Sequence, residues 1–169
     1  MIPVKLEIQG LYSYKEKQTI EFEQLTGAGL FGIFGAVGSG KSSILEAILL
    51  ALYGSTERLS DRGEKNSMLN LQSDQLLINF EFNAGKNNAK TFLARYAAKR
   101  NTKNFEEVKP AEHTFYERIG NSWEAVAEQG EEIAFSHVQV DAVQRLEAVA
   151  IGLGQLANGQ SGTHKNART

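Results

Sequence analysis

The chain has 169 residues, a hydrophobic fraction of 41% and a formal net charge of −2, values typical of one soluble globular domain with no overall attraction to nucleic acid. It contains no cysteine, which excludes disulfides, thiolate zinc sites and a cysteine nucleophile. No apolar run reaches the roughly 18 residues of a membrane span, and the N-terminus lacks the pattern of a signal peptide, so we expect a cytoplasmic protein that contacts no membrane.

The N-terminal part of the chain has the pattern of β-strands. Val4, Leu6 and Ile8 alternate with polar residues, and the segment at residues 19–25 repeats that period of two. Two alternating segments so close together predict an antiparallel pair. The apolar run that follows, GLFGIFG at residues 29–35, does not alternate, which predicts a strand buried on both faces.

The next segment has the pattern of a phosphate-binding loop. Residues 35–42, GAVGSGKS, match G-x-x-x-x-G-K-[ST] at every fixed position. The glycines permit backbone angles that turn successive N–H groups inward around an anion. Lys41 can reach the β- and γ-phosphates of a nucleotide, and the Ser42 hydroxyl can bind the bridging Mg²⁺. The predicted phosphate-binding residues are Gly35, Ala36, Val37, Gly38, Ser39, Gly40, Lys41, Ser42 and Ser43.

A helix is predicted directly after this loop. Residues 41–53 are rich in strong helix formers, and Gly54 follows as a C-cap. The N-terminus of this helix would point its unpaired N–H groups and positive dipole end at the same phosphates. Its residues are apolar nearly all round, which predicts cover on more than one face. A glycine-rich turn with a chance Lys-Ser pair is the alternative, but a strand before the loop and a helix after it favour phosphate binding.

Two β-hairpins are predicted after the polar segment 55–75. The first has strands at residues 76–82 and 91–100, and the second, at residues 112–128, turns at Gly120-Asn121. Antiparallel strands after a phosphate-binding helix differ from the alternating strand–helix order of a small nucleotide kinase or GTPase.

The first hairpin and the segment after it are basic. Residues 86–109 carry seven Lys or Arg side chains against two Glu, a local net charge of +5. This pattern fits a patch that contacts a nucleic-acid backbone, and it fits equally a solvated hairpin with scattered lysines. The candidate DNA contacts are Lys99, Arg100 and Lys103.

The sequence resembles the N-terminal lobe of the SbcC-type ATPases, the bacterial relatives of the Rad subunit in the Mre–Rad DNA-repair complex, within the SMC and ABC-type families. The resemblance rests on Ser13-Tyr14, the GLFGI strand, the phosphate-binding loop, the helix LEAILLALYG and the basic hairpin with ARY, and it runs from Met1 to about Ile133. The fold class that it implies is α/β, namely a P-loop NTPase: the N-terminal lobe of an ABC/SMC-type head with an antiparallel β-subdomain.

The resemblance implies an assembly larger than this chain. In that family an N-terminal and a C-terminal lobe are joined through a long antiparallel coiled coil, and two heads enclose two ATP molecules with Mg²⁺. The head works with an SbcD-type nuclease and couples ATP hydrolysis to the processing of DNA double-strand breaks. The expected partners are therefore the chain's own C-terminal lobe, a second head, the nuclease and DNA.

Several parts that this family needs are missing from the sequence. The strand ending in Asp-Glu has no counterpart, because Asn79 stands where an Asp is wanted and Ala142 follows Asp141. We therefore assign no catalytic residue and expect this chain alone to be inactive. The resemblance predicts an ATPase lobe over residues 1–133. From residue 134 the sequence no longer resembles the family, and we expect the atypical tail at 134–169 to be a frame slip, a truncation or a disordered segment.

Three functions remain open on the sequence. The first is an ATPase lobe that is incomplete on its own. The second is a self-contained P-loop phosphotransferase or nucleotide-binding switch, which predicts a further acidic magnesium ligand and parallel strands between helices. The third is a nucleotide-binding module that only scaffolds a complex. No metalloprotease or Ser-His-Asp pattern is present, and the three histidines are expected on the surface.

Overall fold

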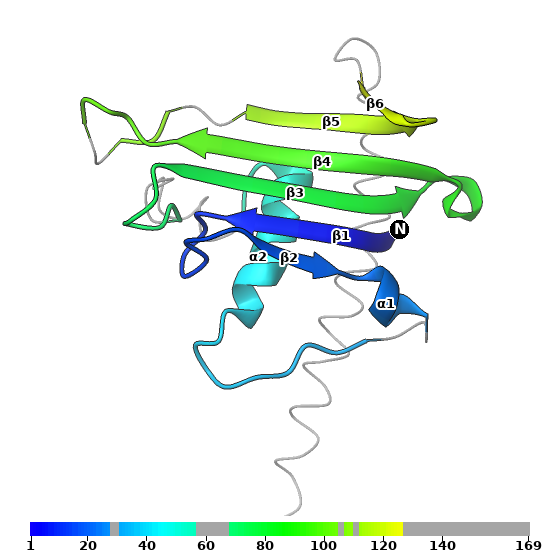
Figure 1. The fold of residues 1–169 in the computed structure, drawn as a ribbon, viewed down its shortest axis with the longest axis horizontal. Helices are drawn as coiled ribbons and strands as arrows, with labels where there is room; N and C mark the ends of the chain where they lie inside the picture. Colours follow the sequence, from blue (N-terminus) through cyan, green and yellow to red (C-terminus); the bar gives the residue numbers. More distant parts are fainter. Residues whose placement is uncertain (28–30, 57–67, 105–106, 110–111, 127–169) are drawn as a thin grey trace, which may run out of the picture.

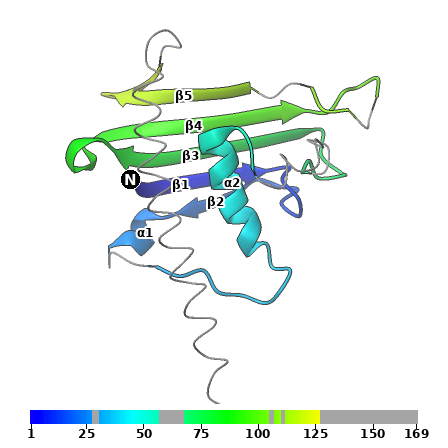
Figure 2. The same ribbon diagram turned by 180° about the vertical axis from the view of Figure 1, so that it is seen from behind.

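The described residues form a six-stranded antiparallel sheet with a long helix across one of its faces (Figure 1, Figure 2). The structure, a computed structural model, describes residues 1–27, 31–56, 68–104, 107–109 and 112–126. The strands lie in the order β2-β1-β3-β4-β5-β6. Their bounds are Ile2–Gln9 for β1, Gln18–Glu21 for β2, Gln75–Ala84 for β3, Lys90–Lys99 for β4, Glu112–Ile119 for β5 and Ser122–Ala125 for β6.

The long helix, α2, covers residues Lys41–Tyr53 as predicted. It ends at Gly54, whose φ of 67° places it in the left-handed region and whose N–H donates to the Leu50 carbonyl at 2.9 Å, so the predicted C-cap is confirmed. The described residues also form two shorter helices, α1, Glu23–Thr26, and the 3₁₀ helix η2, Lys86–Asn88. Among the described residues, no helix combines the length and the apolar character needed to cross a membrane.

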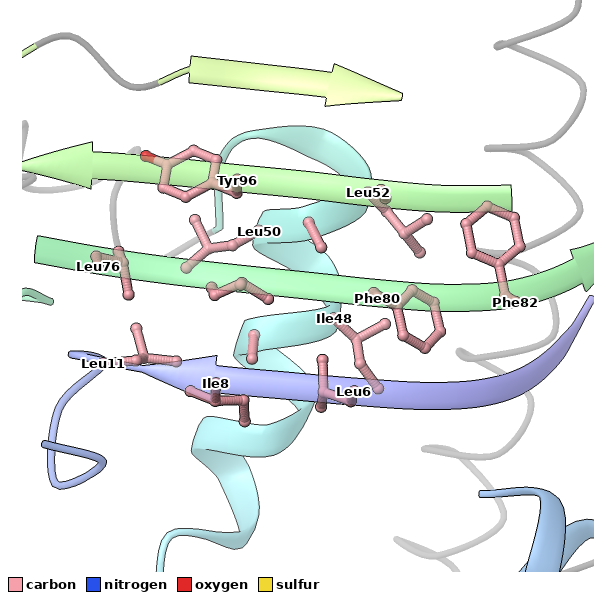
Figure 3. Packing of buried hydrophobic residues seen from close by; sticks show 14 of the residues in the cluster. Leu6, Ile8, Leu11, Ile48, Leu50, Leu52, Leu76, Phe80, Phe82 and Tyr96 are labelled. Carbon is pink, nitrogen blue, oxygen red and sulfur yellow. The ribbon is translucent and has the colours of Figure 1, made fainter. Parts of the chain in front are cut away.

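The hydrophobic core lies between α2 and one face of the sheet (Figure 3). Every second residue of β3 points to that face, because successive side chains of a strand alternate. Burying a Leu, Ile or Phe side chain contributes about 1.5–3 kcal/mol, so this contact is the main source of stability. The buried residues of β3 are Leu76, Ile78, Phe80, Phe82 and Ala84. Those of α2 are Ala47, Ile48, Leu50, Ala51 and Leu52.

The predicted strand pairs are confirmed. β1 pairs with β2, and the two predicted hairpins are formed by β3 with β4 and by β5 with β6. In the second hairpin Ile119 pairs with Ser122 across the two-residue turn. Gly120 has a φ of 61° at the first turn position, where a type II′ turn requires glycine.

Residues 31–35, the described part of the apolar run at residues 29–35, do not form the predicted strand buried on both faces. From residue 31 onward this segment has no regular secondary structure, and Ile33 and Phe34 are 44% and 89% exposed. A strand needs neighbours for its N–H and C=O groups, and the six strands described here pair with one another instead. On α2, Leu45 is 40% exposed, so the predicted cover on more than one face does not reach this residue.

The predicted boundary between a lobe at residues 1–133 and a tail at residues 134–169 lies outside the described residues, as does most of the polar segment 55–75. These two assignments therefore stay predictions.

A polar network joins three segments on the face of the sheet opposite α2. The Glu7 carboxylate of β1 forms ion pairs with Lys5 at 3.2 Å and with Lys17 at 2.9 Å. It also accepts a hydrogen bond from the Asn79 side chain of β3 at 3.0 Å. Burial alone would raise the pKa of Glu7, but the hydrogen bonds from Asn79, Lys17 and Lys5 outweigh it and lower the pKa to about 2.

We predict that Glu7→Gln lowers the free energy of unfolding by about 1 kcal/mol at neutral pH, the scale of a partly exposed ion pair. The folded-state pKa of about 2 lies below the reference value of 4.5, so the carboxylate stabilises the fold above about pH 4.5 and loses that effect as the pH falls toward 2. Urea denaturation at several pH values, with Glu16→Gln as control, should show the difference shrinking in this window. A difference that stays constant down to pH 2 would contradict the assignment.

Candidate functional site

The phosphate-binding loop precedes α2, and its lysine bridges the two sides of the loop. The Lys41 ammonium donates to the carbonyl oxygens of Gly35 at 2.8 Å and Ala36 at 2.7 Å. It also donates to the Ser39 hydroxyl at 3.3 Å. These contacts hold the positive charge of Lys41 over the loop and away from the core. A ligand that replaces the contacts therefore has to offer several acceptor oxygens, as a phosphate group does.

The backbone of the loop takes the form that its glycines allow. Gly38 and Gly40 both have a φ of 85°, in the left-handed region that glycine occupies without a steric penalty. Gly40 is also the N-cap of α2, and its carbonyl accepts the first helical hydrogen bond from Ile44 at 3.3 Å. The N–H groups of the first helical turn have no acceptor within a helix, so together with the helix dipole they favour an anion at this point.

The connection between β1 and β2 lies against this loop. The Tyr14 hydroxyl donates to the Gly40 carbonyl at 3.2 Å. Burial raises the pKa of the Tyr14 phenol above its ordinary value, so the hydroxyl keeps the proton that it donates. An open cleft of about 340 Å³ adjoins the contact between the connection and the loop. Its lining residues are Ser13, Tyr14, Lys15, Glu16, Gln18 and Ser39.

The other end of α2 is tied to the sheet by a histidine that the sequence analysis placed only on the surface. The Nε2 atom of His113, on β5, lies 2.7 Å from the Ala51 carbonyl in the last turn of α2. The carbonyls of the last helical turn receive no hydrogen bond from within the helix. The Nε2–H of His113 therefore donates to one of these carbonyls, that of Ala51. The His113 ring also packs edge-on against Phe115, with centroids 4.9 Å apart. Tyr14 and His113 therefore hold the two ends of the helix that carries the loop.

The three candidate DNA contacts differ in their exposure to solvent. Lys99 and Lys103 are exposed, whereas Arg100 is only 7% exposed. The Arg100 guanidinium donates to the carbonyls of Asn70 at 3.0 Å and Ser73 at 3.3 Å. Arg100 thus holds the segment before β3 instead of facing solvent, because neighbouring residues at the end of a strand point to opposite sides.

Ser42, the predicted magnesium ligand, belongs to no cluster of acidic side chains within the part of the chain that the structure describes. Ser42 is exposed in the first turn of α2, where its hydroxyl can reach a metal bound to phosphates. Asn79 lies on the face of β3 opposite α2, where its side-chain amide donates to the Glu7 carboxylate. Within the ranges that the structure describes, no group of three His, Asp or Glu side chains could hold a metal ion.

The chain matches one protein-family model and is similar to the SbcC subunits of two bacteria. The model of the AAA domain family matches residues 5–156. The chain is 54% identical over 82 residues to the SbcC subunit of the nuclease SbcCD of Bacillus subtilis, which is 48% of this chain and 7% of that protein. The SbcC subunit of Clostridium acetobutylicum is 40% identical over 103 residues, covering 61% of this chain and 8% of that protein.

A more distant relative is the Probable DNA double-strand break repair Rad50 ATPase of Aquifex aeolicus, 37% identical over 82 residues, which are 48% of this chain and 8% of that protein. The chain therefore spans only 7–8% of the length of these three relatives.

A solved structure described as "Structural biochemistry of ATP-driven dimerization and DNA stimulated activation of SMC ATPases" has the same fold. It superposes with a TM-score of 0.50 at 20% identity, over 75% of this chain and 73% of that chain. Together with the AAA domain match, this likeness confirms the predicted fold class, a P-loop NTPase with the antiparallel sheet of an SMC-type head lobe.

We predict that Gly40→Ala destabilises the chain more than Gly38→Ala. Both residues have a φ of 85°, and placing a side chain there costs about 1–2 kcal/mol. A Cβ at position 38 would meet nothing within 4 Å, whereas one at position 40 would lie 2.8 Å from the Tyr14 hydroxyl oxygen. Urea denaturation of both variants measures the difference. Equal losses would mean that the Tyr14 contact does not restrain the loop.

Proposed function

The chain belongs to the AAA domain family, and from this membership we propose that it is the ATP-binding N-terminal lobe of an SbcC-type ATPase. The observation that carries the proposal is the convergence of three features on one small concavity. These are two glycines with a φ of 85°, the ammonium of Lys41 over the loop, and the N-terminus of α2. Each of these favours a polyanion, and together they fit the β- and γ-phosphates of a nucleotide.

The residues of this chain would bind and orient the phosphates. Lys41 would exchange the carbonyls of Gly35 and Ala36 for phosphate oxygens, and the N–H groups of residues 38–43 would surround them. Ser42 would hold Mg²⁺, which neutralises charge on the phosphates when it is bound. The cleft beside Tyr14 and Ser39 adjoins this concavity and offers room for the rest of the nucleotide.

For the complete protein we propose a role in processing the ends of DNA double-strand breaks with an SbcD-type nuclease. The names of the relatives support this role, and their greater length leaves room for the coiled coil and the C-terminal lobe. The exposed Ile33, Phe34 and Val37 support a partner surface beside the loop, which we assign to the C-terminal lobe. Lys99 and Lys103 are the proposed contacts to DNA phosphates, and a second head completes the ATP sites.

A self-contained phosphotransferase or switch is less well supported. That class needs parallel strands between helices, while every described strand pair is antiparallel. A module that only scaffolds a complex would bind a nucleotide without turnover even after the C-terminal lobe is supplied. Measuring turnover with that lobe added therefore distinguishes such a module from an ATPase.

We predict that the chain binds MgATP and that Lys41→Ala weakens binding at least about tenfold, which is a loss of about 1.4 kcal/mol. The variant deletes the positive charge that faces the phosphates. Isothermal titration calorimetry measures both affinities. Lys86→Ala, in η2, serves as the control because it removes a lysine outside the loop, and circular dichroism verifies that each variant is folded. Equal binding by the wild type and Lys41→Ala would overturn the proposal.

We also predict that ATP hydrolysis by the chain alone is near background. Phosphoryl transfer is catalysed mainly by electrostatic groups and by a residue that positions the attacking water, and the described residues supply only the phosphate side of such a site. Phosphate release at saturating MgATP tests this. Steady turnover that disappears in Lys41→Ala would show that an acid has been missed, and Asp141, which lies outside the described residues, would be the first to replace.

A further inference from the structure

A continuous series of contacts joins the basic end of β4 to the phosphate-binding loop, and its first member is Arg100. The guanidinium is almost completely buried and donates to the carbonyls of Asn70, Ser73 and Leu69 at 3.0, 3.3 and 3.5 Å. The Arg100 N–H also donates to the Asp74 carbonyl at 2.9 Å. A buried guanidinium depends on such acceptors, so Arg100 and the segment 68–74 fix each other.

The second member is the contact between that segment and the β1–β2 connection. The Asn70 N–H donates to the Gly10 carbonyl at 2.8 Å, and the Tyr12 N–H donates to the Met68 carbonyl at 2.8 Å. The Asn70 side-chain amide donates to the Tyr12 carbonyl. Gly10 has a φ of 74°, and a Cβ there would lie 1.9 Å from the Gln75 carbonyl oxygen. The connection is therefore held tightly against the start of β3.

The third member is the turn that ends in Tyr14. The Gly10 N–H donates to the Tyr14 carbonyl at 2.6 Å, and the Tyr14 N–H donates to the Leu11 carbonyl at 2.8 Å. The Tyr14 hydroxyl then donates to the Gly40 carbonyl. That carbonyl is the one that accepts the first hydrogen bond of α2, from Ile44. The orientation of Tyr14 therefore bears directly on the helical turn whose N–H groups face the phosphates.

We propose that Tyr14 and Arg100 are positioning residues for the nucleotide site, Tyr14 by holding Gly40 and Arg100 by holding Tyr14 through the segment 68–74 and the turn 10–14. The inference rests on the proposed nucleotide-binding function and adds two residues outside the phosphate-binding motif. Lys99, a proposed DNA contact, directly precedes Arg100, so the series begins at the end of β4 where DNA is proposed to lie.

A double-mutant cycle on the 169-residue chain tests this proposal. Tyr14→Phe removes the hydroxyl and keeps the ring, and Arg100→Gln removes the buried guanidinium. Each should weaken MgATP binding by about three- to tenfold, the effect of losing one hydrogen bond. Because both act through Gly40, the double variant should bind about as well as the weaker single variant. Tyr116→Phe and Arg95→Gln, on the same sheet, are the matched controls and should leave the affinity unchanged.

Hydrogen exchange without nucleotide provides a second readout. If the proposal is right, Tyr14→Phe and Arg100→Gln speed amide exchange in residues 38–46 while the melting midpoint of Tyr14→Phe stays close to that of the wild type. If Arg100→Gln fails to fold, Asn70→Ala breaks the second member of the series without removing a buried charge, and it should show the same local change.

The outcomes separate the two proposals. Wild-type chain that does not bind MgATP overturns the proposed function, and the exchange rates of residues 38–46 still decide the role of Tyr14 and Arg100. Wild-type binding with additive losses in the double variant means that the two residues act independently, and unchanged affinity and exchange in both single variants means that neither positions the site. Either result overturns the inference.

Discussion

The packing of α2 on the inner face of the sheet is the contact on which the rest of the structure depends. Residues 35–39 of the phosphate-binding loop are exposed, with Val37 at its centre fully so, and Tyr14 contacts the loop at Gly40, next to the helix. The position of the loop is therefore inherited from the helix that follows it. Ala47 and Ala51 of the helix and Ala94 of β4 are all buried, and small side chains on both elements allow a close approach. A buried helix thus presents an exposed loop in a fixed place.

The antiparallel sheet and the segment before the loop differ in how far their apolar side chains are buried and their backbone groups are paired. The sheet satisfies its own hydrogen bonds through five strand pairs, so it can fold from local hairpins. The segment before the loop has the composition of a central strand, yet Phe34 is 89% exposed and the described residues 31–35 form no strand. This contrast fits the proposed role as one lobe of a larger ATPase head, in which other parts of the protein would complete the surroundings of the loop.

Local sequence patterns predicted the features that depend on neighbouring residues. The alternation of apolar and polar residues, the glycine turns and the phosphate-binding motif predicted three of the strand pairs, α2 and its C-cap. They did not predict contacts between distant residues, because no pattern marks them. Arg100 and Asn70 are 30 residues apart, Tyr14 and Gly40 are 26 apart, and His113 and Ala51 are 62 apart. The prediction for the apolar run at residues 29–35 was wrong for a related reason. Composition shows that a segment suits a buried strand, but it does not show whether neighbouring strands are present to pair with it.

The most direct test of the account is a titration of the isotopically labelled chain with MgATP, followed by the backbone amide signals in NMR spectra. If the loop and the start of α2 bind the phosphates, the largest changes in chemical shift will fall on the amides of residues 38–43, with smaller ones at Tyr14 across the cleft. Unchanged signals from residues 38–43 at saturating MgATP, or changes confined to the opposite face of the sheet around Glu7 and Asn79, would contradict it.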